Sequence, residues 1–373
     1  MVQNIDIQDL FIIGANGNVG RALVKQILTR GDTMPGDDRN FKTRIVGLAS
    51  SRQFVFSRDG ISDQFADEFS RSRNVSGARG YDSLDALLDA ANGRRVREGT
   101  LAFVDVTAVG EPMTRFHKNV ELNTPYGLVT ANKNPIALSP YGLFQKLTRD
   151  VRRYGYRCSV MAGAGAVPFL QDMRDLNDPL GLITGCLSGT LGFICSQLEY
   201  GKMFSEILAD AKEKGYTEPD PRDDLNGLDV ARKLIVLARS AGYNVGLSDV
   251  DVEPFIPGEY FVSGQSVEEF MASAKGLDSC FIEAMASARE RCNTLRYVAN
   301  LSVSGKTPTL KVSLQEVPVD SELGSLRGTT NKLVIVTGAY DMERPYIIQA
   351  PGAGLDVTAR NIRRDLLSLL PHR

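Results

Sequence analysis

Apolar runs alternate with amphipathic stretches over the first 150 residues. The runs at residues 10–13, 44–49 and 101–106 read as strands, and the third is too continuously apolar for an exposed edge. Residues 126–130 read as a further short strand, and residues 19–29 have the spacing of a helix. Strands that alternate with helices predict a parallel sheet with helices on both of its faces.

The pattern changes in the second half of the chain. Ser139 and Pro140 suit the start of a helix that runs to about Arg153, and longer amphipathic helices follow. Alternating apolar positions from Leu295 onward predict an antiparallel or mixed sheet. The elements predicted in this half are helices at 204–214 and 228–240, each closed by a glycine, strands at 295–303, 309–314 and 333–337, and a Gly-rich turn with an amphipathic helix at 351–370.

Composition and charge narrow the class of protein. The 373 residues are enough for two domains, and 43% hydrophobic with 24% charged residues is ordinary for a soluble globular protein. A net charge of -2 gives no general attraction to nucleic acid or to an anionic membrane. We therefore expect a small-molecule substrate, and neither nucleic acid nor a membrane as a partner.

Cysteine, histidine and the N-terminus point to the cytoplasm and limit the chemistry. The five cysteines include no Cys-x-x-Cys pair, which fits a reducing compartment. Only two histidines occur, His117 and His372, so proton transfer is expected to fall to lysine or a carboxylate. Residues 1–9 have no targeting character, and no apolar run approaches the roughly 18 residues of a membrane span. We expect a cytoplasmic protein.

Residues 11–20, FIIGANGNVG, join a predicted strand to a predicted helix through a glycine turn. Small turn residues let the backbone approach a pyrophosphate, whose charge lies against the helix N-terminus. Gly14, Gly17 and Gly20 are spaced G-x-x-G-x-x-G, one residue longer than the common pattern. The strand before and the helix after favour a dinucleotide site over a purely structural turn. Its expected contacts are Gly14, Asn16, Gly17, Asn18 and Val19.

The residues after the second strand bear on the choice of cofactor. A carboxylate at this point would hold the ribose 2′-hydroxyl of NAD, but the strand ends in Ala49, Ser50, Ser51 and Arg52. Hydroxyls and a guanidinium suit a 2′-phosphate better. NADP(H) is therefore the preferred cofactor, with Ser51 and Arg52 as contacts, and NAD(H) stays possible. The alternative in which the Arg52 side chain points into solvent and binds no cofactor also stays open.

The stretch over residues 216–233, YTEPDPRDDLNGLDVARK, gathers acidic residues ahead of a helix that carries Lys233. Pro219 and Pro221 are expected to hold the acidic part extended, so that its carboxylates point into a cleft. Asp229 lies four residues before Lys233 on one helical face, which on its own would suit a surface salt bridge of about 0.2–0.5 kcal/mol.

Taken with three shorter motifs, this stretch resembles the homoserine dehydrogenase family. TANK at 130–133, LSGT at 187–190 and GAGLDVT at 352–358 match that family's segments after the fifth strand, in the substrate domain and at the C-terminus. The resemblance extends from the glycine turn to the last helix. It implies reversible NAD(P)-dependent hydride transfer between L-aspartate 4-semialdehyde and L-homoserine, in the biosynthesis of threonine, methionine and isoleucine.

The resemblance also implies an α/β fold in three segments. We expect a Rossmann-type dinucleotide-binding domain over residues 1–155, a substrate and dimerisation domain over 156–340, and a C-terminal segment over 341–373 that packs on the first domain. A homodimer is expected through the strand-rich region after residue 295. No kinase-like or ligand-sensing sequence accompanies the motifs, so a monofunctional enzyme is expected.

Residue roles follow from the same resemblance, position by position. The catalytic residues would be Lys233, Lys133 and Asp229, with the two lysines flanking the reacting oxygen. Substrate binding would involve Glu218 and Asp229 at the ammonium group, Asp224 as the residue that orders the acidic lysine pocket, and Gly189 and Thr190 near the carboxylate. Thr107 at the nicotinamide, Lys133 and Gly354 would complete the cofactor site.

The chemistry agrees with these roles. Hydride delivered to an aldehyde leaves an alkoxide, which needs a nearby cation and a proton. Two ammonium groups close together disfavour each other's charge, so one of them can transfer a proton near neutral pH. The sequence does not say which of Lys133 and Lys233 is the acid.

One departure concerns a metal ion. Many family members place a glutamate before a Gly-Ala-Gly-x-Pro turn, where it helps to hold a monovalent cation. Residues 156–168 read YRCSVMAGAGAVP, with Cys158 or Ser159 at the glutamate's position and one extra residue. Sodium or potassium would have to use backbone carbonyls, those of Met161, Gly163, Ala164 and Ala166.

Three alternatives stay open. Aspartate-semialdehyde dehydrogenase shares the glycine spacing but needs a nucleophilic cysteine with a histidine base, and neither Cys186 nor Cys195 has an evident histidine partner. Another NADP-dependent amino-acid aldehyde dehydrogenase is a second possibility. An inactive NADP-binding regulatory protein is the third, and it would be expected to have lost the lysines.

Overall fold

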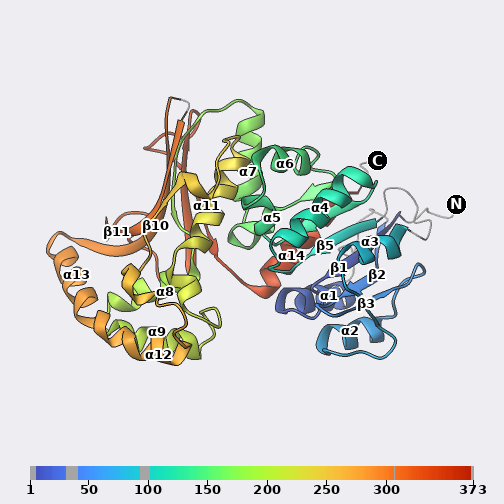
Figure 1. Cartoon of the computed structure of the whole chain (residues 1–373). Helices are drawn as coiled ribbons and strands as arrows, with labels where there is room; N and C mark the ends of the chain where they lie inside the picture. Colours follow the sequence, from blue (N-terminus) through green and yellow to red (C-terminus); the bar gives the residue numbers. More distant parts are fainter. Residues whose placement is uncertain (1–5, 31–40, 93–100, 306, 371–373) are drawn as a thin grey trace. The chain divides into compact units, whose positions relative to one another are not determined.

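The structure, a computed structural model, describes residues 6–30, 41–92, 101–305 and 307–370 (Figure 1). It divides into two compact units: unit 1 comprises Met1–Gly163 and Gly354–Arg373, and unit 2 comprises Ala164–Ala353. The first five residues, with their expected lack of a leader, and His372 lie outside the described residues. Within the described ranges, no helix has the length and apolar character needed to cross a bilayer.

Unit 1 is built on a seven-stranded sheet in the order β4-β3-β2-β1-β5-β6-β7. Strands β2, β1, β5, β6 and β7 run parallel, whereas β3 and β4 extend the β2 edge in antiparallel fashion. The chain leaves β1 toward β2 and later returns to its other side with β5, which places a switch point between β1 and β5. The strands are β1 (Asp6–Ile13), β2 (Phe41–Ala49), β3 (Gln53–Phe56), β4 (Arg79–Gly80), β5 (Leu101–Asp105), β6 (Gly127–Thr130) and β7 (Tyr154–Gly155).

Helices cover both faces of this sheet, as the alternating pattern predicts. Leu10 and Ile12 of β1 share a buried cluster with Leu23 of α1 and Leu366 of α14. On the other face the ring of Phe11 stacks on Phe103, with ring centroids 5.2 Å apart. The helices of unit 1 are α1 (Asn18–Arg30), α2 (Asp63–Arg71), α3 (Asp85–Asn92), α4 (Glu111–Asn123), α5 (Asn134–Ala137), α6 (Tyr141–Leu147) and α14 (Leu355–Ser368), with 3-10 turns η1 (Arg157–Ser159) and η2 (Met161–Gly163).

The C-terminal helix belongs to unit 1 through specific contacts. The Gln8 side chain donates to the Leu366 carbonyl at 2.7 Å, and Gln26 of α1 donates to the Asp356 carbonyl at 2.8 Å. The chain re-enters unit 1 at Gly354, later than the expected boundary at 341, because residues 346–351 form a strand of unit 2. At the other boundary, unit 1 continues past residue 155 to Gly163.

One predicted helix is much shorter than expected. Pro140, with φ -53° and ψ 141°, is itself the N-cap of α6, and no side chain caps the helix, so Ser139 does not have the capping role. The helix ends at Leu147 and not near Arg153, because residues 148–153 turn the chain into β7, with the Arg153 amide donating to the Asp150 carbonyl.

Unit 2 contains a mixed six-stranded sheet in the order β13-β12-β8-β10-β11-β9, which confirms the prediction of an antiparallel or mixed sheet from residue 295 onward. Its neighbours pair in antiparallel fashion except β11 and β9, which are parallel. The helices α8 (Gly189–Leu198), α11 (Leu228–Ser240) and α13 (Asp278–Glu290) contact β10. The strands are β8 (Leu180–Cys186), β9 (Val250–Val252), β10 (Asn293–Ser304), β11 (Thr307–Pro318), β12 (Thr330–Thr337) and β13 (Tyr346–Pro351).

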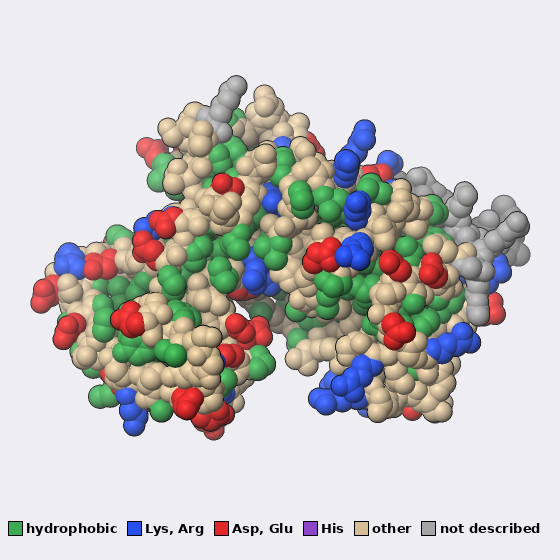
Figure 2. Space-filling view, viewed as in Figure 1, with side chains coloured by type: hydrophobic (Ala, Val, Ile, Leu, Met, Phe, Trp, Pro, Cys, Tyr) green, Lys and Arg blue, Asp and Glu red, His purple; other side chains and the backbone are tan. Residues whose placement is uncertain are grey.

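The helices of unit 2 pack around an aromatic core. The rings of Phe204 and Phe281 stack with centroids 4.6 Å apart, and Phe255 stacks on Phe281 at 5.3 Å. On the face seen in Figure 2, acidic and basic side chains are interspersed, in keeping with the small net charge. The helices are α7 (Ala166–Asp175), α8 (Gly189–Leu198), α9 (Phe204–Glu213), α10 (Arg222–Leu225), α11 (Leu228–Ser240), α12 (Val267–Ser273) and α13 (Asp278–Glu290), with 3-10 turns η3 (Leu247–Asp249), η4 (Gly258–Tyr260) and η5 (Ala274–Leu277).

Candidate active site

The glycine turn lies at the switch point of the unit 1 sheet. Gly14 adopts φ 89°, and its amide donates to the Ala49 carbonyl at the end of β2, at 2.8 Å. A Cβ on Gly20 would lie 2.2 Å from the Gly14 carbonyl oxygen, so only glycine lets α1 begin this close to the turn. The α1 helix starts at Asn18 and directs its first amides out of its N-terminus, as a pyrophosphate site requires.

Two arginines meet beside this turn, and only one of them was predicted. Arg52 lies in the tight connection between β2 and β3, where the Ser50 hydroxyl accepts from the Arg52 and Gln53 amides. Arg73 follows α2, too far along the chain for a local sequence signal to connect it with Arg52. Neither guanidinium pairs with a carboxylate of the described residues. Together they border a cavity of about 320 Å³, lined by Asn16, Ser50, Ser51, Arg52, Arg73 and Asn74.

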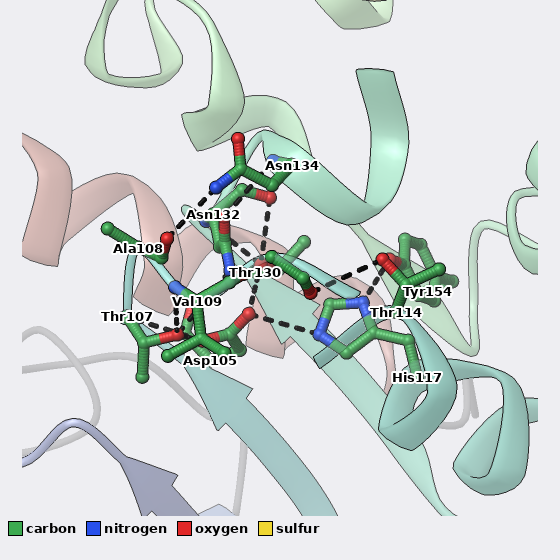
Figure 3. Close-up of polar contacts among 11 residues, drawn as sticks. Asp105, Thr107, Ala108, Val109, Thr114, His117, Thr130, Asn132, Asn134 and Tyr154 are labelled. Carbon is green, nitrogen blue, oxygen red and sulfur yellow. Dashed lines mark hydrogen bonds and ion pairs between the residues drawn. The ribbon is translucent and has the colours of Figure 1, made fainter. Parts of the chain in front are cut away.

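The neighbouring end of β5 carries a buried carboxylate, shown in Figure 3. Asp105 Oδ1 accepts from the Thr107 amide at 2.9 Å and from the Thr107 hydroxyl at 2.7 Å. The methyl group of Thr107 lies 3.0 Å from the position of a Cβ on Gly14. Thr107, predicted for the nicotinamide end of the cofactor site, is thus fixed over the glycine turn.

The turn that carries Lys133 is tied to the Thr107 loop by its two flanking asparagines (Figure 3). Asn132 donates from its side chain to the Val109 carbonyl at 2.8 Å, and Asn134 donates to the Ala108 carbonyl at 2.9 Å. Lys133, partly buried, is the N-cap residue of α5. Within unit 1, the predicted residues Thr107 and Lys133 therefore lie on two loops that are hydrogen-bonded to each other.

Gly354 is the N-cap residue of α14, and the Thr358 amide donates to its carbonyl at 2.9 Å. The contact between Gln26 and Asp356 holds the start of α14 beside α1. This places Gly354 in unit 1, the unit that carries the glycine turn.

In unit 2 the predicted lysine makes two short contacts. Lys233 Nζ donates to the Leu187 carbonyl at 2.7 Å and pairs with Asp229 Oδ2 at 2.7 Å. The Lys233 side chain is only 14% exposed, so this pair is more than the surface salt bridge that the spacing alone allowed. The Leu187 carbonyl, in the first residue of the LSGT motif but with no role predicted for it, therefore helps to hold the ammonium group.

Asp224 joins the acidic stretch to the LSGT turn. Its Oδ1 accepts from the Thr190 hydroxyl at 2.9 Å, and its Oδ2 accepts from the Glu218 amide at 2.7 Å. Burial raises the pKa of Asp224 to about 6, and the nearby negative charges of Glu218 and Asp229 act in the same direction. Asp224 is thus a carboxyl that gains its charge between weakly acidic and neutral pH.

The acidic stretch was expected to be extended, but the structure shows a turn and a short helix there. Pro221, with φ -59° and ψ -19°, is the N-cap residue of the short helix α10, because the backbone angle fixed by its ring also suits the start of a helix. Asp220 is held by the Arg222 guanidinium, whose hydrogen bonds lower the pKa of that carboxyl. The Glu218 side chain is exposed.

The LSGT turn links β8 to α8. Ser188 is the N-cap of α8, and its hydroxyl accepts from the Leu191 amide at 3.2 Å. The first amides of the helix, those of Gly189 and Thr190, therefore face outward from its N-terminus, where a carboxylate is favoured. The Thr190 hydroxyl also contacts the Tyr216 carbonyl at 2.7 Å, which ties this turn to the acidic stretch.

Uncharged side chains, those of Cys158 and Ser159, stand where the glutamate of other family members would fall at the predicted cation site. Cys158 and Ser159 are buried and donate to the carbonyls of Thr358 and Tyr156. The described ranges contain no cluster of His, Cys, Asp and Glu suited to a metal ion. A sodium or potassium ion on the carbonyls of residues 161–166 stays a prediction, which the dependence of turnover on these ions tests.

The fold and the two clusters define a class of protein. Unit 1 has the Rossmann arrangement, with a glycine turn, two arginines and the Lys133 loop at the carboxyl ends of its parallel strands. Unit 2 adds a cluster of Lys233, Asp229 and Asp224 beside a helix N-terminus. The chain is a two-unit protein of the Rossmann-fold class.

Comparison with known proteins specifies the family. The model of the family described as homoserine dehydrogenase matches residues 169–367. A homoserine dehydrogenase of Emericella nidulans is 34% identical over 311 residues, which cover 80% of this chain and 82% of that protein. The chain belongs to the homoserine dehydrogenase family.

Other relatives are longer or more distant. A bifunctional aspartokinase/homoserine dehydrogenase of Haemophilus influenzae is 34% identical over 376 residues, which cover 100% of this chain and 44% of that protein. The chain thus spans less than half the length of that relative. A hyperthermophilic archaeal homoserine dehydrogenase, solved in complex with NADPH, has the same fold, with a TM-score of 0.67, 20% identity, and coverage of 97% of each chain.

Proposed function

We propose that this chain catalyses reversible NADP-dependent hydride transfer between L-aspartate 4-semialdehyde and L-homoserine. The observation that carries the proposal is the unit 2 cluster, in which Lys233 is mostly buried between Asp229 and the Leu187 carbonyl, in a chain of the homoserine dehydrogenase family. A buried amine with acids beside it suits an amino-acid substrate whose carbonyl oxygen receives a proton.

The residues of unit 1 fit NADP(H). Glycine at position 20 lets α1 pack directly against the glycine turn, and amides at the N-terminus of such a helix suit a pyrophosphate. Arg52 and Arg73 together suit a 2′-phosphate, because guanidinium groups bind phosphate oxygens in a charge-assisted, bidentate manner. The NADPH bound by the archaeal relative supports the same cofactor. When bound, reduced nicotinamide supplies the hydride.

The chain's own residues would do the remaining work. Lys233 and Lys133 stabilise the alkoxide that forms at the substrate oxygen, and one of them gives it a proton. Asp229 holds the Lys233 ammonium in place. In the reverse direction the same amine, once neutral, accepts the hydroxyl proton of homoserine.

Substrate selection is by charge. Glu218, Asp224 and Asp229 supply the negative charge that binds an ammonium group, and the amides of Gly189 and Thr190 at the start of α8 suit a carboxylate. An aldehyde that lacks these two groups would bind without orientation and react slowly.

The direct test is an assay of the purified chain with L-aspartate 4-semialdehyde, in which nicotinamide absorbance is followed with NADPH and, separately, with NADH. We expect oxidation with both the aldehyde and NADPH present, a higher kcat/KM for NADPH than for NADH, and little reaction with butanal. NADPH binding without turnover would favour an inactive regulatory protein. Faster turnover of another amino-acid aldehyde would favour a different dehydrogenase.

We also propose that the chain forms a homodimer through the sheet of unit 2. Edge strand β13 carries the half-exposed apolar side chain of Ile347, which association would cover. Light scattering coupled to size-exclusion chromatography tests this, and a mass of 40.7 kDa would show a monomer.

A further inference from the structure

His117 is fully buried, although the proposed chemistry makes no use of histidine. It lies on α4 with 0% exposure, and its ring is placed between two polar side chains in Figure 3. Nε2 is 3.1 Å from Asp105 Oδ2, and Nδ1 is 2.6 Å from the Tyr154 hydroxyl. A buried imidazole with a partner on each nitrogen has a fixed orientation and a fixed tautomer.

The proton positions follow from the partners. An ionised Asp105 can only accept, so His117 Nε2 carries a proton and donates to it. Burial raises the pKa of Tyr154 well above its ordinary value, so the Tyr154 hydroxyl keeps its proton and can donate to Nδ1. A neutral imidazole satisfies both contacts, because its Nε2 proton is donated to Asp105 in a hydrogen bond and its Nδ1 accepts the hydrogen bond of the Tyr154 hydroxyl.

Asp105 transmits this order to the candidate site. Its carboxylate, also fully buried, is the acceptor for the Thr107 amide and hydroxyl, and Thr130 Oγ1 lies 3.3 Å from its Oδ2. Thr130 Oγ1 in turn accepts from the Asn132 amide at 2.9 Å. The Asp105 carboxylate is thus hydrogen-bonded directly to the Thr107 loop and, through Thr130, to the Lys133 loop.

We propose that His117 is a positioning residue, which orients Asp105 and through it the two loops that carry Thr107 and Lys133. The inference rests on the proposed function for the meaning of those loops, but not for their geometry. Without the imidazole donor, Asp105 Oδ2 would keep one weak partner in a site that excludes water, and the carboxylate would be free to turn away from Thr107.

The test compares three substitutions on α4. His117→Phe keeps a planar ring but removes both hydrogen bonds, and His117→Gln keeps a donor for Asp105. Arg115→Gln, on the exposed side of the same helix, is the matched control. Amide hydrogen exchange of Thr107 and Asn132 reports on the loops without any need for turnover.

We expect His117→Phe to speed exchange at both loops and to lower kcat/KM for NADPH, each by roughly tenfold or more. The KM for the aldehyde should change less than the KM for NADPH, because the residues assigned to the substrate's ammonium and carboxylate groups lie in unit 2. His117→Gln should recover most of both effects, and Arg115→Gln should match the wild type. In an Asp105→Asn background, His117→Phe should add almost nothing.

Wild-type exchange at both loops in a folded His117→Phe variant would overturn the proposal, and so would exchange that rises equally throughout unit 1. If His117→Phe does not fold, Tyr154→Phe removes the Nδ1 partner alone and is expected to change the same two loops by a few-fold; no change there would overturn the proposal. A wild type that lacks turnover would disprove the proposed function, while the exchange result would still decide the role of His117.

Discussion

Asp224 offers a test of the substrate pocket through its charge. Burial moves the pKa of this carboxyl from 3.8 to about 6, which corresponds to roughly 3 kcal/mol in favour of the neutral form in the folded protein. The stabilising effect of the protonated form is complete below pH 3.8 and is lost as the pH rises through 6. The ionised form is therefore present at neutral pH at the expense of stability.

This charge should appear in the kinetics. Below pH 6 the pocket has one negative charge fewer, so we expect kcat/KM for the ammonium-bearing aldehyde to fall with decreasing pH through about 6. Asp224→Asn removes the titration and should give a flat, low profile over the same range. Because the amide avoids the cost of a buried charge, the free energy of unfolding of the variant should exceed that of the wild type between pH 5 and 8. This gain is reduced by about 1 kcal/mol, because the amide nitrogen that replaces one carboxylate oxygen cannot accept the hydrogen bond from Thr190 or from Glu218.

The measurement is a pH profile of kcat/KM from pH 5 to 8, together with thermal unfolding of both proteins. Asp220→Asn is the matched control, because Arg222 holds the pKa of Asp220 low and its titration falls outside this range. If the wild type has no step near pH 6, or if Asp224→Asn keeps one, the role assigned to this carboxyl is refuted.

Three further predictions concern the cofactor site and the lysine pair. Arg73→Ala should raise the KM for NADPH about tenfold and leave the KM for NADH unchanged, because a guanidinium–phosphate contact contributes about 1.5–3 kcal/mol. Gly20→Ala should lower the free energy of unfolding by roughly 1–3 kcal/mol and weaken NADPH binding, because its Cβ would lie 2.2 Å from the Gly14 carbonyl oxygen; thermal unfolding and NADPH fluorescence titration measure this. Asp229→Asn should lower kcat/KM for the aldehyde about tenfold or more, because Lys233 would lose its charged partner; steady-state kinetics measure this.

Each of these has a control in the same unit. Arg71→Ala removes a guanidinium that is already paired with Asp67 and should not change cofactor preference. Gly142→Ala places a Cβ where no atom lies within 4 Å and should not destabilise the protein. Asp210→Asn breaks an exposed pair with Lys214 and should leave turnover unchanged. Equal effects in a test variant and its control would contradict the structural cause assigned to that residue.

The pattern of apolar and polar residues predicted the elements that are specified mainly by interactions between residues close in sequence. The helix at 228–240 is α11, Leu228–Ser240, because its apolar positions repeat with the helical period and a glycine follows its end. The strand β8 was missed, because LGLITGC is short and contains two glycines, and its identity as a strand comes from pairing with β10 and β12 on either side.

The same division applies to the candidate site. The acidic stretch and Lys233 are close in sequence, so their proximity could be predicted. The motif at 187–190 does not signal that the Leu187 carbonyl contacts Lys233, and no spacing signals the places of Arg73 and His117, because all three depend on tertiary contacts. Pro221 shows a further limit, because proline suits both an extended segment and the start of a helix, and the fold selects the helix.

We propose that Lys233 and Lys133 are each needed for proton transfer at the reacting oxygen, and the most direct test is to remove each amine in turn. Lys233→Ala and Lys133→Ala are assayed for oxidation of NADPH by L-aspartate 4-semialdehyde, and NADPH binding is measured by fluorescence titration. Loss of proton transfer predicts a fall in kcat of about 10²- to 10⁴-fold in each variant, with NADPH binding largely intact. A variant that binds NADPH and keeps most of its turnover would contradict this claim.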